Sequence, residues 1–199
     1  MADRHTILAH RIRLLVWATI AYNVFEAVVA LTEGARASSM ALVGFGLDSV
    51  IEVSAAAAVA WQFAAPDPER REHAAQRFVA FSFFALAAYV GVESVRSLLG
   101  YSQARHSPIG IALAAASLVL MPLLAWLQIR AGREIGSRSV VANAHQTLLC
   151  SYLSAALLVG LVLNTAFGWA WADPLAALVI AGFAVREGLE AWRGDPCCG

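Results

Sequence analysis

The chain has 199 residues, of which 60% are hydrophobic and 14% charged, and its formal net charge is zero. In soluble globular domains about a quarter of the residues are charged, so this composition excludes an ordinary soluble domain. A neutral chain also lacks the basic surplus with which proteins bind nucleic acid, so we expect no nucleic-acid partner. The mean hydropathy of +0.66 instead favours a protein whose main partner is the lipid bilayer.

Six apolar segments follow one another along the chain, each long enough to cross a hydrocarbon core about 30 Å thick as a helix. They cover residues 14–31, 40–65, 78–99, 109–129, 140–163 and 169–192. The first is too long for a signal peptide and lacks a clean cleavage site, so it is interpreted as a retained span. Short polar separators make neighbouring helices antiparallel. We therefore predict an all-α integral membrane protein, a bundle of six transmembrane helices forming a single domain over residues 1–199.

The arginines are divided unequally between the two sides that six antiparallel spans would create. Short cytoplasmic loops are enriched in basic residues, so we place the N-terminus inside. The outer side then holds Arg36, Arg96 and Arg105, and the inner side holds Arg4, Arg11, Arg13, Arg70, Arg71, Arg77, Arg130, Arg133, Arg138, Arg186 and Arg193. This bias predicts that both termini face the cytoplasm, in the cell's inner or plasma membrane.

Two carboxylates lie one helical turn apart in the second apolar segment. Asp48 and Glu52 are four residues apart, so a helix places both on one face. Adjacent carboxylates in hydrocarbon repel each other unless a cation or shared protons neutralise them. A divalent cation would do so, and the alternative is a protonated pair that only ties helices together. Gly44 and Gly46 would let a ligand or, more simply, a neighbouring helix approach the backbone.

The fifth segment offers partners for such a cation. Gln146 and Cys150 are also four residues apart and share a face, and His145 lies beside that face. A cysteine thiolate suits zinc and other soft or borderline metals, whereas carboxylate oxygens are more permissive. The simpler interpretations are that the cysteine fills space and that the histidine bonds a neighbouring helix. The candidate metal ligands are thus Asp48, Glu52, Cys150, Gln146 and His145.

Two further pairs of polar residues lie inside apolar segments. Asn23 and Glu26 are three apart in the first segment and could line the same cavity as the carboxylates or simply bridge helices. Glu93 and Arg96, near the outer end of the third segment, are predicted to pair within their helix.

Two motifs lie near the end of the chain. Asp173 and Pro174 have the pattern of a helix start, with an acid near the positive end of the dipole and a proline in the first turn. Cys197 and Cys198 could bind metal at the cytoplasmic mouth or simply form a tail without a function in metal binding. The sequence contains no phosphate loop, no His-Glu-x-x-His motif and no nucleophile motif, so we expect a protein that is not an enzyme.

At these residues the chain resembles the cation diffusion facilitator family of metal/proton antiporters. That family carries Asp-x-x-x-Asp in its second span, often within Asp-Ser-x-x-Asp, and residues 48–52 read Asp-Ser-Val-Ile-Glu. Residues 171–178, Trp-Ala-Asp-Pro-Leu-Ala-Ala-Leu, are similar to the opening of the family's sixth span. The residues that precede the acidic motif also fall where the family tends to place them: Asn23, Glu26, Gly34, Ser38 and Ser39.

The resemblance also has two departures. The family's fifth span carries His-x-x-x-Asp, and the matching pair here is Gln146 and Cys150. The family's cytoplasmic metal-binding domain has no counterpart in these 199 residues, so we expect a short form of the family.

The resemblance implies six spans with both termini inside and alternating access around a midplane site. We expect export of a divalent metal ion, zinc or a similar ion, from the cytoplasm in exchange for protons. Asp48, Glu52 and Cys150 would bind the ion, and Gln146 or His145 would complete its shell. We also expect a homodimer. The alternative is a membrane metal-binding regulator or partner subunit that does not transport, in which the polar cluster only holds helices together.

Overall fold

The computed structural model describes residues 2–63, 69–134 and 138–193. Within these ranges, only the backbone is described for residues 2–10, 59–60, 62–63, 69–72, 138–143 and 145–146. The described residues form six helices: α1 (Ala2–Ala37), α2 (Met40–Phe63), α3 (Glu69–Leu98), α4 (Pro108–Glu134), α5 (Arg138–Phe167) and α6 (Ala172–Arg193). The predicted all-α fold is confirmed.

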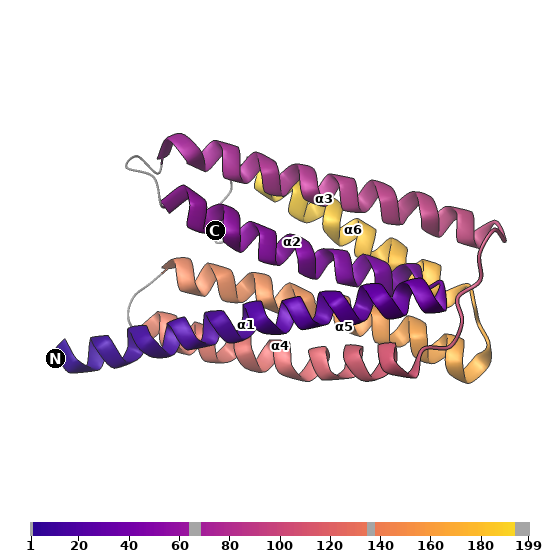
Figure 1. Cartoon of the computed structure of the whole chain (residues 1–199), viewed down its shortest axis with the longest axis horizontal. Coiled ribbons are helices and arrows are strands. Elements are labelled where there is room, and N and C mark those ends of the chain that lie inside the picture. The colour runs from indigo at the N-terminus through magenta and orange to yellow at the C-terminus, as the bar shows by residue number, and fades with distance from the viewer. Residues whose placement is uncertain (1, 64–68, 135–137, 194–199) are drawn as a thin grey trace.

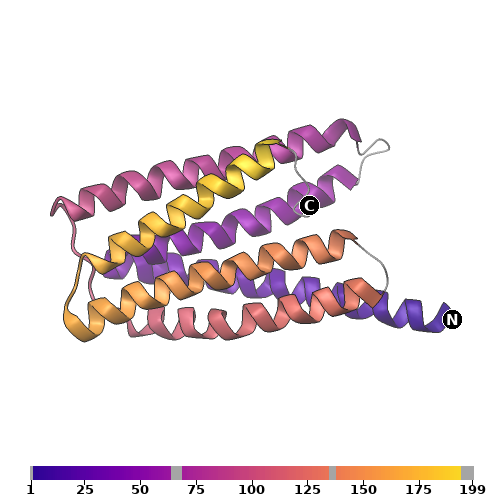
Figure 2. The same cartoon turned by 180° about the vertical axis from the view of Figure 1, so that it is seen from behind.

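The helices form one elongated bundle in which each runs antiparallel to its chain neighbours (Figure 1). Around the bundle the contacts follow the order α1, α2, α3, α6, α5 and α4, and α4 closes the ring against α1. α2 also contacts α5 and α6 across the interior. Seen from behind, α5 and α6 lie in front of α2 (Figure 2). The interior position of α2 is what allows one of its faces to meet side chains from several other helices.

Helices α1, α3, α4 and α5 run beyond the apolar segments that predicted them, whereas α6 begins at Ala172, three residues after its predicted start at residue 169. Residues 32–37, 130–134 and 164–167 were expected in polar separators, but the structure places them in the last turns of α1, α4 and α5. After α3 and α5 a glycine ends the helix. Gly100 (φ 90°) follows α3 and Gly168 (φ 67°) follows α5, both in the left-handed region that glycine adopts without steric cost. The Gly168 N–H donates to the Asn164 carbonyl at 3.0 Å, which closes the end of α5.

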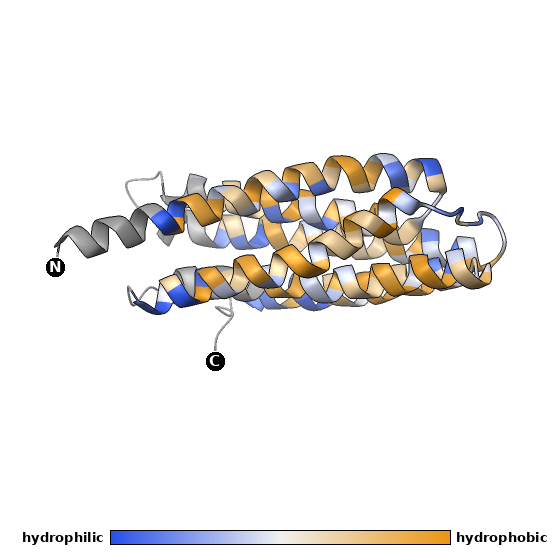
Figure 3. Cartoon of the chain, turned by 90° about the horizontal axis from the view of Figure 1, so that it is seen from below, coloured by the Kyte–Doolittle hydropathy of each residue, from blue (hydrophilic) through white to orange (hydrophobic). Residues whose placement is uncertain are grey.

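The surface of the bundle has the character of a lipid-facing surface. By length and composition, five of the described helices, α1 to α5, can cross a membrane. Large apolar side chains point outward along them, including Trp17, Phe81, Val119 and Val159. In Figure 3, hydrophobic residues (orange) run along the helices, and hydrophilic residues (blue) gather in the loop at the right-hand end of the bundle. An apolar surface this extensive is unfavourable in water, so the chain is an all-α membrane protein.

The sixth helix differs from the others in its charge. α6 is 22 residues long and contains five charged residues: Asp173, Arg186, Glu187, Glu190 and Arg193. It packs along α3 and also contacts α5 and α2, so much of its surface faces protein rather than the surroundings. Two of its acidic residues lie at structurally important positions inside the bundle, described below.

Small residues bring α2 close to its neighbours. A methyl group at Gly46 would lie 3.0 Å from the backbone nitrogen of Leu31 and 3.1 Å from the Ala30 Cβ, both on α1. A methyl group at Gly44 would lie 3.3 Å from the Val90 side chain on α3. The simpler interpretation of these two glycines, close helix packing, is therefore the one that the structure supports.

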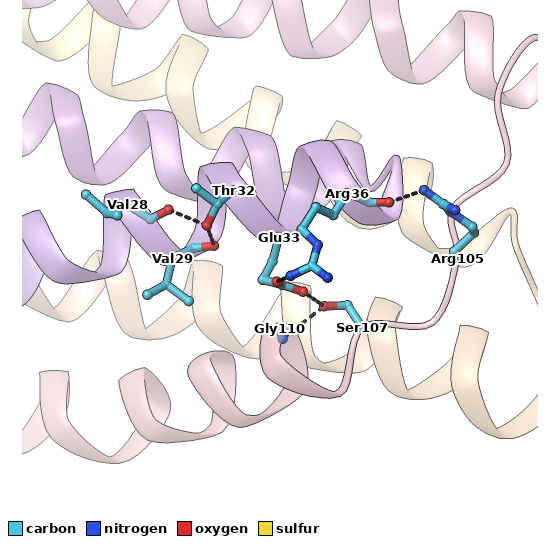
Figure 4. A network of polar contacts seen from close by, with 8 residues as sticks. All are labelled: Val28, Val29, Thr32, Glu33, Arg36, Arg105, Ser107 and Gly110. Atoms are coloured by element: carbon cyan, nitrogen blue, oxygen red, sulfur yellow. Dashed lines mark hydrogen bonds and ion pairs between the residues drawn. The ribbon is translucent and has the colours of Figure 1, made fainter.

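Polar contacts join α1 to the loop that leads into α4 (Figure 4). The Arg105 guanidinium donates to the backbone carbonyl of Arg36, and the Ser107 hydroxyl donates to Glu33 at 3.3 Å. Ser107 also accepts the backbone N–H of Gly110 at 3.0 Å, which makes it the N-cap of α4. These contacts fix the end of the bundle at which α1 ends and α4 begins, called here the loop end.

The arginines separate between the two ends of the bundle. Arg36, Arg96 and Arg105 lie at the loop end, where the chain passes from α1 to α2 and from α3 to α4. Arg96 pairs with Glu93 at 2.8 Å within α3, which confirms the predicted pair. The other eleven arginines lie at or toward the opposite end, where α1 begins and α6 ends, called here the arginine-rich end. Which side of the membrane each end faces stays a prediction.

Candidate metal centre

Three candidate ligands come together between α2 and α5. The Cys150 thiol donates to Glu52 Oε1 at 2.9 Å, and its sulfur lies 3.8 Å from Asp48 Oδ2. One ligand atom from each residue can be chosen so that all three lie within 4.8 Å of one another. Cys150 is fully buried and Asp48 is 5% exposed. The helical spacing that placed Asp48 and Glu52 on one face was therefore correct, and that face points at α5.

The dimensions of this cluster suit a single small ion. Ligand atoms bound to one tetrahedral zinc ion lie about 3.4–3.6 Å apart, given metal–oxygen and metal–sulfur bonds of about 2.1 and 2.3 Å. Closing the present arrangement onto an ion therefore needs side-chain shifts of about 1 Å. The three residues line a cavity of about 10 Å³, roughly the space of one water molecule. Its wall is completed by Phe83, Leu149, Leu153, Phe183, Ala184 and Glu187.

A side chain of α1 holds one of these candidate ligands in place. The Asn23 amide donates from Nδ2 to Glu52 Oε2 at 2.6 Å. Glu52 thus has one carboxylate oxygen bonded to α5, through Cys150, and the other bonded to α1. Asn23 is 4% exposed, so this hydrogen bond is shielded from water. Outer partners of this kind fix the orientation of a ligand before the ion arrives.

Glu26 forms a second buried polar cluster, next to the first. It is fully buried and accepts hydrogen bonds from Ser49 on α2, at 2.7 Å, and from Ser117 on α4. The Tyr22 hydroxyl extends this cluster by a 2.8 Å hydrogen bond to Ser117. Of the two interpretations for Asn23 and Glu26, helix bridging is the one the structure shows, because neither lines the cavity and each bonds a neighbouring helix.

Asp173 positions the helix that carries the two carboxylates. It lies in the first turn of α6, as predicted, but its carboxylate bonds the start of α2. It accepts hydrogen bonds from the Ser39 hydroxyl and from the backbone N–H groups of Met40, at 2.9 Å, and Ala41, at 3.5 Å. Ser39 in turn accepts the Leu42 N–H at 3.1 Å. The free N–H groups of a helix start are costly when buried, so this double cap fixes α2 relative to α6.

Other predicted residues are only partly placed. Gln146 and His145 belong to α5, but their side chains lie outside the described residues, as do Cys197 and Cys198 entirely. Glu187, which lines the cavity, is a residue that the sequence analysis missed. An acid inside the sixth apolar segment was the available signal for it, but its neighbours Arg186 and Glu190 give the stretch the appearance of a solvated helix end.

Comparison with known proteins agrees with this architecture. Residues 16–193 match the model of the cation efflux transmembrane domain. An uncharacterized transporter of Synechocystis sp., sll1263, is 29% identical over 181 residues, which cover 85% of this chain and 58% of the relative. The cation-efflux pump FieF of Shewanella oneidensis is 32% identical over 113 residues, which cover 57% of this chain and 36% of the relative.

The chain thus spans less than two thirds of the length of either relative. The family match, in contrast, extends from the middle of α1 to the end of α6 and includes every candidate ligand. The chain belongs to the cation efflux family.

Proposed function

We propose that this protein binds a divalent metal cation between Asp48, Glu52 and Cys150 and exports it from the cytoplasm. The observation that carries the proposal is the meeting of these three side chains, from two helices, inside a bundle that crosses a membrane. Ionisable groups are expensive in hydrocarbon and mark transport pathways in membrane proteins. A metal cation is the simplest partner that neutralises two carboxylates and a thiolate at one point.

Zinc or a similar ion is the cargo that these ligands favour. Zinc is bound by cysteine sulfur, histidine nitrogen and carboxylate oxygen, most often in a tetrahedral arrangement. Three ligands are available in the cluster, so one position remains for a fourth. Purely oxygen-binding ions such as magnesium gain nothing from Cys150 and prefer six ligands.

Exchange for protons follows from the chemistry of the same groups. In this structure the Cys150 thiol donates its hydrogen to Glu52, whereas a thiolate is the form that binds zinc. Binding of the ion would therefore release a proton, and reprotonation would help to release the ion. Proton antiport is thus part of the proposal.

The orientation proposed for the bundle in the membrane rests on the arginine distribution. Eleven arginines lie at the end where α1 begins and α6 ends, and three lie at the loop end. Under the positive-inside rule, the arginine-rich end faces the cytoplasm. Impermeant thiol labels applied outside intact cells should leave the tail cysteines Cys197 and Cys198 unlabelled, and labelling from outside would contradict this orientation.

The functional test uses protein reconstituted into sealed vesicles, with a metal-sensitive dye inside and with or without a pH gradient. Asp48→Asn and Glu52→Gln each remove one charge and keep the size of the side chain. We expect both to abolish saturable zinc binding and zinc uptake. Glu93→Gln, on α3 at the loop end and outside the cluster, is the matched control and should transport like the wild type.

The outcomes separate transport from the alternatives. If the carboxylates only tie helices together, the neutral variants should be as stable as the wild type or more so, since they remove a charge from hydrocarbon. Binding of zinc without uptake would indicate a metal-binding regulator or subunit. Wild-type protein that gains no thermal stability from zinc, cadmium, cobalt, manganese or iron would overturn the proposal.

The possible homodimer stays a prediction. Gly91 on α3 and Gly182 on α6 have no neighbouring atoms within 4 Å of the position of a Cβ, so small residues face outward there. Small residues at helix surfaces allow close association in membranes. Mass measurement in mild detergents and in lipid discs is the check, and a clean monomer in all of them would contradict a dimer.

A further inference from the structure

Glu187 lies in the wall of the cavity that holds the three candidate ligands. It is carried by α6, whereas Asp48 and Glu52 come from α2 and Cys150 from α5. Glu187 is six residues from the end of α6 at Arg193, in the half of the helix nearer the arginine-rich end. The cavity thus contains acidic or thiol groups from three separate helices.

One oxygen of the half-buried Glu187 side chain lacks a hydrogen-bond partner. Its Oε1 atom is enclosed and accepts no hydrogen bond from any described residue. The adjacent Arg186 instead bonds Glu190, one turn further along, at 2.8 Å. An enclosed carboxylate oxygen without a partner lowers the stability of the fold. It therefore needs a hydrogen-bond donor or a cation, and the apolar wall supplies neither.

A cation fits this position better than any group in the wall. None of the described residues lining the cavity carries a positive charge, and the remaining wall residues are aliphatic or aromatic. A volume of about 10 Å³ admits one ion or one water molecule. The three clustered ligands leave one position of a tetrahedral zinc ion unfilled.

We propose that Glu187 is a ligand of the transported cation, contributed by α6, so that the ion is held by three helices. This inference rests on the proposed function, because it assigns a further ligand to the same site. It also has a consequence for metal preference. Asp48, Glu52 and Glu187 together form an all-oxygen set, which suits manganese, whereas Cys150 adds the soft ligand that suits cadmium and zinc.

The test compares manganese and cadmium affinity of purified protein by titration calorimetry. Glu187→Gln should lower manganese affinity at least tenfold and cadmium affinity by less, because the thiolate remains. Glu190→Gln is the matched control, since it removes the same charge from the same helix but outside the cavity, and it should bind both ions like the wild type. Cobalt absorption spectra supply a second readout, and Glu187→Gln should alter them while Glu190→Gln does not.

The outcomes distinguish this inference from the proposed function. If Glu187→Gln binds both ions like the wild type while Asp48→Asn loses binding, Glu187 is not a ligand and the proposed site remains. If the wild type binds no ion, both proposals fail. Should Glu187→Gln not fold, Glu187→Asp keeps the charge and shortens the side chain by one methylene. It should also weaken manganese binding, and unchanged binding would overturn the inference.

Discussion

Replacing Asn23 with alanine removes the amide that holds Glu52 in the proposed metal site. The hydrogen bond from Asn23 Nδ2 to Glu52 Oε2 is 2.6 Å long and shielded from water. A hydrogen bond to a charged group contributes about 1.5–3 kcal/mol. Outer partners of metal ligands change affinity by about 10–100-fold, a range consistent with that energy. We expect Asn23→Ala to weaken zinc or cadmium binding by about 10–100-fold, because Glu52 must then be oriented at the moment of binding.

A matched control separates this effect from loss of stability. Asn164 is also a buried asparagine, 3% exposed, and donates to the Ala104 carbonyl at 3.1 Å, but it lies at the loop end. Asn164→Ala should lower the thermal unfolding temperature without ion about as much as Asn23→Ala does. Only Asn23→Ala should change the Kd, measured by competition with a chelating dye. Equal Kd values for the two variants would refute the reasoning.

Substitutions at three residues have further expected outcomes. Cys150→Ser should weaken zinc binding more than manganese binding in calorimetry, since it deletes the soft ligand. Equal losses of affinity for both metals would contradict thiolate ligation. Cys150→Asp should be tolerated. Asp173→Ala should destabilise the fold by about 2–4 kcal/mol, because it leaves the start of α2 without its buried cap, and Asp173→Asn should recover part of this in unfolding measurements. Gly46→Ala should cost about 1–3 kcal/mol, since the added methyl meets the Leu31 backbone, and an unchanged unfolding temperature would show that α1 can move away.

The agreement between sequence and structure is closest where helix geometry alone decides. The four-residue spacing of Asp48 and Glu52 requires a shared face on any helix, and the structure shows that face meeting Cys150. The three-residue spacing of Glu93 and Arg96 likewise led to the observed ion pair. Helix ends were harder to locate. Hydropathy falls where polar residues begin, whereas α1, α4 and α5 continue through them, so the separators were drawn too long.

The sequence pattern could not predict contacts between helices that lie far apart along the chain. Asp173 was correctly placed at the start of α6, yet its hydrogen bonds go to α2, more than a hundred residues earlier. Glu187 looked like part of a charged helix end, and only the packing of α6 turns it into the cavity. For Asn23, two interpretations remained open until the structure showed its amide on Glu52.

The sequence by itself determined the membrane class, the helices and the faces on which the acids lie, because hydropathy and the helical repeat are local properties of the chain. The tertiary structure decided which faces meet. That depends on how six helices share the interior, and small residues such as Gly46 set how closely α2 approaches its neighbours. The position of α2 between α1, α5 and α6 brings Asn23, Cys150 and Glu187 around one pair of carboxylates, a convergence that no single stretch of sequence contains.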